Sequence, residues 1–321
     1  MKIQGFAASE AMGVLAPFEY EAEPGADEVL VRVTHCGICH SDVHLADGDW
    51  GEFFPLVPGH EIVGEVEQGP GFAPGTRVGV GWQCGSCGTC EWCKAGKEVV
   101  CAEHQGTCMG HHGGFASHVI AQRRFVFPLP QELDSASAAP LFCGGATVYT
   151  PLNLYASPGT RVAVIGIGGL GHLAVQFAAK MDCDVTAVST RTDKEAEAKS
   201  YGASHFLVGE PPSRSFDLVL NTSTANMDME LWLEALRPEG VFAQLGAAPQ
   251  PIEVAAFPLI LGYRSVTGTG VAHPAVLQGM LEFAARHGVE AQVQVMPMDR
   301  CNEAMEVTRS GAARYRVVLE R

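Results

Sequence analysis

The sequence predicts an α/β protein that combines a mostly-β lobe with a doubly wound parallel sheet. The first part of the chain alternates short β-prone runs with Gly- and Pro-containing turns, which is typical of an antiparallel, barrel-like lobe. From about residue 161 the pattern changes to continuous apolar runs separated by helical segments, which is typical of βαβ units. At 321 residues the chain also exceeds one typical domain.

Each predicted element corresponds to one such run. In the first lobe the predicted strands are Val29–Val33, Ile62–Val66, Arg77–Val80 and Ser117–Ile120. In the second part they are Val162–Gly166, Val185–Val188, Leu218–Leu220 and Val241–Leu245, with helices near 170–180, 193–201 and 228–236 between them. The tail carries an amphipathic helix at Ala275–His287 and a strand at Tyr315–Leu319, and we expect it to rejoin the first lobe. The predicted domains are therefore 1–145 with 275–321, and 146–274.

Composition excludes several classes of protein. A formal net charge of -15 argues against nucleic-acid and anionic-membrane partners, since both bind basic patches. No apolar run approaches the ~20 residues of a membrane span. The segment Met1–Gly13 lacks the basic-then-apolar layout of a signal peptide. Eleven cysteines, grouped at metal-ligand spacings, therefore favour reduced thiols in a cytoplasmic metalloprotein over a disulfide framework.

Four cysteines form the run Cys87-x2-Cys90-x2-Cys93-x7-Cys101. Four thiolates can surround one Zn²⁺ tetrahedrally, and with all four positions filled by protein the metal is structural. Three alternatives exist. The first is a set of four unrelated buried cysteines that share this spacing by chance. An iron–sulfur cluster also takes four thiolates, and a shifted register would use Cys84 in place of Cys101. We favour Cys101, because it anchors a whole loop rather than one short turn.

A second donor set is dispersed along the first lobe and consists of Cys39, His60 and Cys143. Two thiolates and one imidazole leave one tetrahedral position open, which distinguishes a catalytic zinc from a structural one. Judged by residue types alone, an isolated His60-Glu61 pair is more often structural.

A glycine motif, Gly166-x-Gly168-x-x-Gly171, follows the apolar run Arg161–Ile165 and opens a predicted helix at Leu170–Ala179. In this strand–turn–helix context it predicts a Rossmann dinucleotide site, where the pyrophosphate rests on the helix N-terminus. The predicted contacts in this loop are Gly166, Gly168, Gly169, Leu170 and Gly171.

Cofactor preference depends on the residues that follow the second strand of this domain. An NAD site carries Asp or Glu there, which accepts from the ribose 2′-OH. This chain has Ser189, Thr190 and Arg191, then Lys194, so two cations can pair with a 2′-phosphate. Asp193 comes four residues after the strand and is interpreted as a helix-start residue. NADP(H) is therefore predicted, the alternative being that the two cations are merely solvated.

Five motifs occur in the order Gly37-Ile-Cys-His-Ser41, Gly59-His-Glu-Ile-Val-Gly64, the four-cysteine run, Gly145-Ala-Thr-Val-Tyr149 and Gly166-Ile-Gly-Gly-Leu-Gly-His172. Together they resemble the zinc-dependent medium-chain alcohol dehydrogenases, in particular the cinnamyl-alcohol-dehydrogenase-like branch with its bacterial aldehyde reductases. The resemblance runs nearly end to end and closes with Arg314-Tyr-Arg-Val-Val318. It implies a GroES-like catalytic domain, a Rossmann domain, a site in the cleft between them, and a homo-oligomer, most simply a dimer.

The same resemblance implies roles for the first-lobe residues. Cys39, His60 and Cys143 would bind the catalytic zinc, and Glu61 would lie beside the metal and enter its shell during ligand exchange. Ser41 would touch the zinc-bound alcohol oxygen, and His44 would end a proton relay. A hydroxyl can both donate and accept, and an imidazole titrates near neutral pH, so the two groups suit proton transfer to solvent.

The implied reaction is primary alcohol + NADP⁺ ⇌ aldehyde + NADPH + H⁺. Trp50 and Trp82 are candidate walls of an aromatic-tolerant substrate pocket, or else ordinary core or surface aromatics. The segment Glu103–Gly114 is shorter than is usual in this family, which predicts a more open substrate mouth. Two rival functions are a reductase of C=C or C=N bonds with zinc absent or idle, and a silent zinc-stabilised binding protein.

Overall fold

The computed structural model describes residues 1–321, which form two compact units. Unit 1 comprises Met1–Cys143 and Ala272–Arg321, and unit 2 comprises Gly144–Val271. Each unit has its own buried apolar core. The combination of a mostly-β unit with a parallel-sheet unit confirms the predicted fold class.

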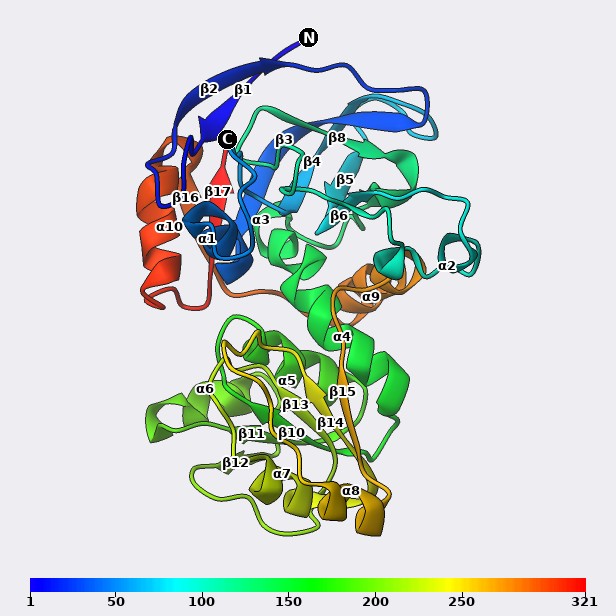
Figure 1. The fold of residues 1–321 in the computed structure, drawn as a ribbon, viewed down its shortest axis with the longest axis vertical. Coiled ribbons are helices and arrows are strands. Elements are labelled where there is room, and N and C mark those ends of the chain that lie inside the picture. The colour runs from blue at the N-terminus through cyan, green and yellow to red at the C-terminus, as the bar shows by residue number, and fades with distance from the viewer. The chain divides into compact units, whose positions relative to one another are not determined.

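A seven-stranded sheet organises unit 1 (Figure 1). Its order is β16-β17-β3-β4-β5-β9, and β8 also pairs with β3. The strands are β3 (Glu28–Ile38), β4 (Glu61–Gln68), β5 (Arg77–Val80), β8 (His118–Gln122), β9 (Phe127–Pro128), β16 (Val293–Pro297) and β17 (Arg316–Glu320). Two antiparallel pairs accompany it, β1 (Lys2–Ala7) with β2 (Ala16–Glu21) and β6 (Gln83–Gly85) with β7 (Gln105–Gly106). All four strands predicted for this lobe form, and the C-terminal strand β17 pairs with β3.

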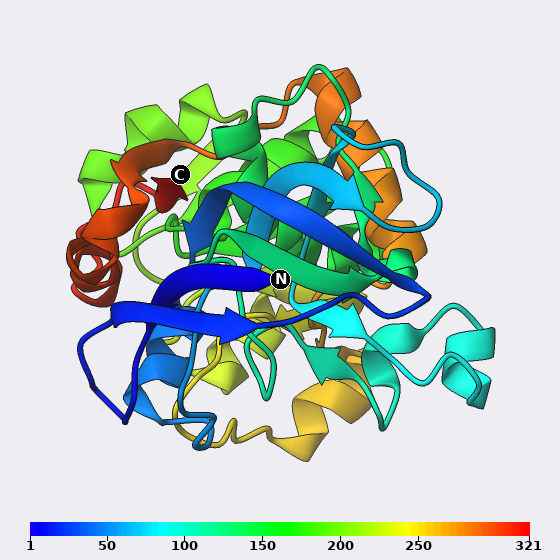
Figure 2. The same cartoon turned by 90° about the horizontal axis from the view of Figure 1, so that it is seen from above.

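The helices of unit 1 are short, apart from α9. They are α1 (His40–Asp47), α2 (Glu91–Lys94), α3 (Ser135–Ala138), α9 (Pro274–His287) and α10 (Cys301–Arg309), with 3-10 turns η1 (Glu98–Val100), η2 (Arg123–Phe125), η3 (Ala139–Phe142) and η5 (Met298–Arg300). Figures 1 and 2 show the loop around α2 projecting at one edge of this unit, with α10 at the opposite edge.

Unit 2 is a six-stranded, all-parallel sheet of order β12-β11-β10-β13-β14-β15. Its strands are β10 (Arg161–Ile165), β11 (Asp184–Val188), β12 (His205–Leu207), β13 (Phe216–Asn221), β14 (Leu236–Gln244) and β15 (Ser265–Gly268). Its helices are α4 (Gly144–Tyr155), α5 (Gly171–Lys180), α6 (Glu195–Ser200), α7 (Met229–Ala235) and α8 (Ala256–Gly262), with the 3-10 turn η4 (Thr192–Lys194).

Several strands extend beyond their predicted bounds; β3, for example, continues to Ile38 instead of ending at Val33. β14 begins at Leu236, directly after α7, well before the predicted start at Val241. Phe216 pairs with Leu236 while Leu218 pairs with Val241, so the register is irregular and several residues bulge between the two pairs. The residues of this bulge are mostly polar and include a proline. The strand was predicted from its apolar run alone, so its first part was not recognised.

Candidate metal centres and cofactor site

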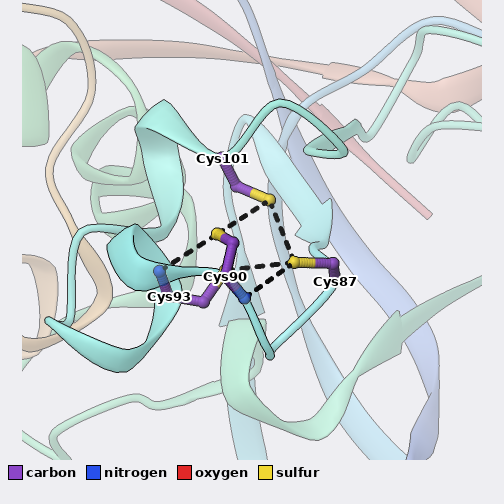
Figure 3. Close-up of side chains that lie close together, drawn as sticks. All are labelled: Cys87, Cys90, Cys93 and Cys101. Atoms are coloured by element: carbon purple, nitrogen blue, oxygen red, sulfur yellow. Dashed lines mark hydrogen bonds between the residues drawn. The ribbon is translucent and has the colours of Figure 1, made fainter.

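The four cysteines of the loop around α2 converge on one point (Figure 3). The Cys101 sulfur lies 3.5 Å from that of Cys87 and 3.8 Å from that of Cys90. The sulfurs of Cys87 and Cys93 are 3.9 Å apart. A tetrahedron with Zn–S bonds of ~2.3 Å has edges of about 3.8 Å. The spacing therefore fits a single zinc ion held entirely by thiolates.

Hydrogen bonds from backbone amides stabilise the thiolate form of two of these cysteines. The Sγ of Cys90, the residue that caps α2, accepts a hydrogen bond from the Cys93 amide at 3.4 Å. The Sγ of Cys87 accepts one from the Cys90 amide at 3.4 Å. Such bonds from the amides of Thr89 and Cys90 lower the pKa of Cys87 to about 6, which favours the thiolate that a metal binds.

Cys84 stays outside this group. Its buried thiol donates to the Gln105 carbonyl at 3.5 Å, and burial raises its pKa to about 12. The residues that the structure brings together are thus Cys87, Cys90, Cys93 and Cys101, not the shifted set that would begin at Cys84.

A second group joins Cys39, His60, Glu61 and Cys143, whose ligand atoms all lie within 4.8 Å of one another. The Cys143 thiol donates to the Cys39 sulfur at 4.0 Å, and this bond lowers the pKa of Cys39 well below its usual range. His60 is fully buried, and its Nε2 has no hydrogen-bond partner. A buried imidazole nitrogen without a partner is costly, so its presence here fits a bound metal ion.

The register of β3 and β4 brings this second group together. Cys39 follows the end of β3 and Glu61 begins β4, and the antiparallel register pairs Gly37 with Glu61. A Cβ at Gly37 would lie 2.2 Å from Glu61 Oε2, so only glycine leaves room for that carboxylate. Cys143 comes from a distant part of the sequence, where it ends η3.

Asp42 is a site residue that sequence reasoning missed. Its fully buried carboxylate accepts from the Cys39 amide at 2.9 Å, the Gly59 amide at 2.9 Å and His60 Nδ1 at 2.8 Å. The carboxylate thereby orients His60 Nε2 toward the two thiols, as outer-shell carboxylates do for histidines that bind metals. Its position three residues after Cys39, in the first turn of α1, was the available sequence signal.

Arg316 is the second missed residue. Its buried guanidinium pairs with Glu61 Oε1, although the two residues are 255 positions apart. Burial raises the pKa of Glu61 to about 7 despite the opposing charge of Arg316. The other carboxylate oxygen, Oε2, has no partner. Glu61 therefore lies beside the donor set with one oxygen uncommitted.

Ser41 and His44 lie on α1, the helix that begins directly after Cys39. Ser41 Oγ is 3.6 Å from Cys39 Sγ. His44 is partly exposed, and its Nδ1 lies 2.7 Å from a carboxylate oxygen of Asp49, another residue absent from the sequence-based site. A hydroxyl therefore lies beside the buried Cys39 sulfur, and an imidazole on the same helix is in reach of solvent.

The two predicted tryptophans lie beside these residues. Trp82 meets the His60 ring edge-on at 5.0 Å, and Trp50 meets Trp82 at 6.3 Å. Trp50 also stacks on His44 at 4.9 Å and is 39% exposed. Two aromatic rings thus lie beside the donor set, and the outer one, Trp50, is partly exposed.

The loop Glu103–Gly114 contributes one more buried thiol. Asp42, His60 and Cys108 form a third close group, but the Asp42 oxygens already accept from amides and His60, so this group lacks a free ligand set. His111 Nδ1 donates to the Thr107 carbonyl at 3.2 Å, and neither His111 nor His112 joins a group of possible metal ligands.

The glycine loop of unit 2 links β10 to α5. A Cβ at Gly171 would lie 1.8 Å from the Gly166 carbonyl oxygen, so helix and strand are packed too closely for a side chain. A Cβ at Gly168 would meet no atom within 4 Å. Thr222, which the sequence did not single out, donates to the carbonyls of Ile165 and Gly166 at 2.8 Å. Gly169 and Leu170 complete the loop, and Leu170 caps α5. The result is an open cradle at a helix N-terminus, which suits a pyrophosphate.

The turn after β11 holds the residues predicted to select the cofactor. Ser189 Oγ accepts from the Arg191 amide at 3.2 Å, and Thr190 lies between them. Lys194 Nζ donates to the Ile167 carbonyl at 2.7 Å, which ties this turn to the glycine loop. Asp193 lies in η4, as its interpretation as a helix-start residue implies, but its carboxylate also binds the Arg191 side chain.

No helix of this protein combines the length and the apolar character needed to span a bilayer.

Comparisons with known proteins agree with this geometry. Residues 25–131 match the family model described as alcohol dehydrogenase GroES-like domain, and residues 169–286 match zinc-binding dehydrogenase. The chain is 43% identical to aldehyde reductase AdhA of Synechocystis sp., covering 99% of this chain and 98% of that protein. It is 37% identical to probable cinnamyl alcohol dehydrogenase 6 of Arabidopsis thaliana, covering 98% and 93%.

Solved structures show the same architecture. A cinnamyl alcohol dehydrogenase of Sorghum bicolor superposes with a TM-score of 0.94 at 36% identity, covering 100% of this chain and 98% of that one. The cinnamyl alcohol dehydrogenase of Helicobacter pylori, solved in complex with NADP(H), gives a TM-score of 0.91 at 28% identity over the same shares.

Proposed function

The chain belongs to the zinc-dependent alcohol dehydrogenase family, in which it resembles aldehyde reductases and cinnamyl alcohol dehydrogenases, and from this premise we propose that it reduces aldehydes to primary alcohols with NADPH. The observation that carries the proposal is the pairing of a closed four-thiol group with an open group, Cys39, His60 and Cys143, beside a hydroxyl. A closed set of four thiolates suits a structural zinc, and a set of three ligands with an open position suits a catalytic one.

We assign the structural zinc to Cys87, Cys90, Cys93 and Cys101, and the catalytic zinc to Cys39, His60 and Cys143. The donor chemistry fits: two thiols and an unpartnered imidazole nitrogen are borderline-soft ligands, which zinc prefers. When bound, the catalytic zinc supplies a Lewis acid that lowers the pKa of an alcohol and polarises a carbonyl. Glu61, with one free oxygen, is proposed to assist ligand exchange at this centre.

The protein's own part in the reaction is proton movement and positioning. We assign Ser41 as the group that exchanges a proton with the substrate oxygen, because a hydroxyl donates and accepts in turn. His44, held by Asp49 and partly exposed, then exchanges the proton with solvent. Trp50 and Trp82 exclude water from one side and favour flat, aromatic aldehydes in a broad substrate range.

NADP(H) is the proposed cofactor and supplies the hydride. The Gly166–Gly171 loop fits its pyrophosphate, because backbone at Gly168 is unobstructed and the α5 N-terminus faces that loop. Ser189, Thr190, Arg191 and Lys194 are proposed to bind the 2′-phosphate, since this turn has donors where an NAD site has a carboxylate on the strand end.

We also propose a homodimer formed through unit 2. β15 is one of the two edge strands of its sheet, and α8, which directly precedes β15, exposes Phe257, Ile260 and Leu261 at 67 to 76%. An unpaired edge beside an apolar patch is the typical setting for isologous pairing with a second copy. Eleven free cysteines fit a reducing compartment, so we place the enzyme in the cytoplasm.

Purified protein tests the proposed function directly. Metal analysis should give two zinc ions per chain, and NADPH should be oxidised with a panel of aliphatic and aromatic aldehydes, faster than NADH. Activity confined to C=C or C=N substrates, without zinc, would instead identify the reductase alternative. One zinc per chain and no oxidation with any aldehyde would identify a zinc-stabilised binding protein.

A further inference from the structure

The Arg191 side chain is already engaged by a carboxylate of its own turn. Arg191 Nε donates to Asp193 Oδ1 at 3.1 Å, and Nη2 donates to Asp193 Oδ2 at 2.5 Å. This is the side-on, bidentate geometry in which arginine binds carboxylates most specifically. Both side chains are largely exposed, at 72% and 45%, so the pair lies on the open surface of the turn.

The Ser189 hydroxyl is placed differently. Its Oγ accepts from the Arg191 amide and keeps its own hydroxyl proton available as a donor. Lys194 Nζ donates to the Ile167 carbonyl, which holds the ammonium beside the glycine loop. The Arg191 guanidinium, by contrast, is shared with an anion.

We propose that Asp193 is a specificity-determining residue that weakens the preference for a 2′-phosphate over a free ribose 2′-OH, and so for NADPH over NADH. The inference rests on the proposed NADP(H) site. Asp193 occupies two of the five guanidinium N–H donors and adds a negative charge next to the bound phosphate, which carries nearly two. A ribose 2′-OH is neutral and is not repelled. Asp193 thus acts against one cofactor and leaves the other unaffected.

The size of the effect follows from exposure. Charges a few ångströms apart near a surface interact weakly, and exposed pairs are screened by salt. Removing the carboxylate should therefore raise affinity for the 2′-phosphate by about three- to tenfold, and this gain should shrink as salt is added.

The experiment measures binding of two cofactor fragments by calorimetry, with no turnover required. Adenosine 2′,5′-bisphosphate carries the 2′-phosphate and adenosine 5′-monophosphate lacks it. Asp193→Asn keeps the shape of the side chain and removes its charge. Glu195→Gln removes a charge two residues away, from a carboxylate that pairs with Lys199 at 2.7 Å and not with Arg191. Arg191→Ala tests the underlying site.

We expect Asp193→Asn to bind the bisphosphate about three- to tenfold more tightly at low salt, with the gain mostly lost near about 0.5 M salt. Binding of the monophosphate should not change, and Glu195→Gln should show less than half the gain. Weaker bisphosphate binding by Asp193→Asn would mean that Asp193 only organises Arg191. An equal change for both fragments would mean a structural effect, and no change would mean a screened pair; each of these results overturns the proposal.

Failure of the NADP(H) assignment gives a different pattern. In that case wild-type protein would bind the bisphosphate no more tightly than the monophosphate, and Arg191→Ala would leave both affinities unchanged. If wild type prefers the bisphosphate and Arg191→Ala removes that preference, the site stands whatever Asp193→Asn does.

Discussion

Asp42 is the residue on which the geometry of the open donor group most depends. One buried carboxylate satisfies two backbone amides and fixes the imidazole of His60, so the turn Cys39–Asp42 and the segment Gly59–His60 are held together. Removing a buried acceptor leaves its donors without partners, which costs more than the bond itself contributes. The charge also matters, because it stabilises the Nδ1–H tautomer of His60.

Asp42→Asn should therefore lower zinc affinity at the catalytic centre by about 10- to 100-fold. The amide keeps the size of the side chain but can accept only through one oxygen, so one of the three donors is lost. Competition with a zinc chelator, followed by metal analysis, measures the effect. The zinc at the four-cysteine group is the internal control. Equal loss of both ions would show general unfolding and not a local effect.

Ser41→Ala should leave zinc content and cofactor binding near wild type while turnover falls by ~10² or more, the usual scale for a positioned proton-transfer group. The hydroxyl lies 3.6 Å from Cys39 Sγ, but it is not a member of the donor group. His44→Ala should cost less, because water can replace a partly exposed relay group. Steady-state kinetics of both variants decide the order, and near-native turnover of Ser41→Ala would remove this residue from the reaction.

At the scale of elements, two glycines of the loop between β10 and α5 are needed for different reasons: Gly171 for packing of the protein and Gly168 for binding of the cofactor. Gly171→Ala would drive a Cβ into the Gly166 carbonyl and should destabilise unit 2 by about 1–3 kcal/mol. Gly168→Ala meets no protein atom, so its melting temperature should match wild type. Its affinity for NADP(H) should nevertheless fall by about tenfold or more, because the backbone here must approach the pyrophosphate. Thermal melts with fluorescence titrations test the pair, and wild-type affinity in Gly168→Ala would place the pyrophosphate elsewhere.

The short helix α3 begins with a cap that makes stability depend on pH. The Asp134 carboxylate accepts from the amides of Ser137 and Ala136, at 3.1 and 3.0 Å. These bonds hold the pKa of Asp134 below its ordinary value. A lowered pKa means that the cap stabilises the fold fully above the unfolded-state pKa of about 3.9 and is lost as pH falls through the folded-state pKa.

Asp134→Ala should therefore cost about 1 kcal/mol of the free energy of unfolding at neutral pH. The difference from wild type should close as the pH falls below about 4. Asp134→Asn is the matched control, since asparagine caps helices nearly as well and does not titrate. Urea titrations at several pH values give the measurement. A difference that persists unchanged in acid would show that the carboxylate charge has no part in the cap.

Across the whole molecule, sequence reasoning succeeded where the pattern is local. Apolar runs such as Val162–Ile165 and the cysteine spacing from Cys87 to Cys101 specify an element or a donor group within a few residues. It failed where partners are far apart in sequence: Arg316 meets Glu61 across 255 residues, and nothing near either residue predicts the pair. Asp42 lies between these cases, because its place after Cys39 is a helix-start signal while its bond to His60 is tertiary.

The exposed apolar face of α8 predicts how two copies of this chain assemble. Leu261 is 76% exposed on α8, beside Phe257 at 73% and Ile260 at 67%, and Tyr263 follows at 81%. So much apolar surface on one short helix is costly in water unless a second copy covers it. Leu261→Asp would place a charge on this apolar surface, and the proposed dimer should dissociate to monomers in sedimentation and light scattering, with unchanged zinc content. Val14→Asp is the control, because Val14 is 75% exposed but belongs to unit 1 and not to α8. Wild-type protein that sediments as a monomer, or a Leu261→Asp dimer as tight as wild type, would rule out this surface as the interface.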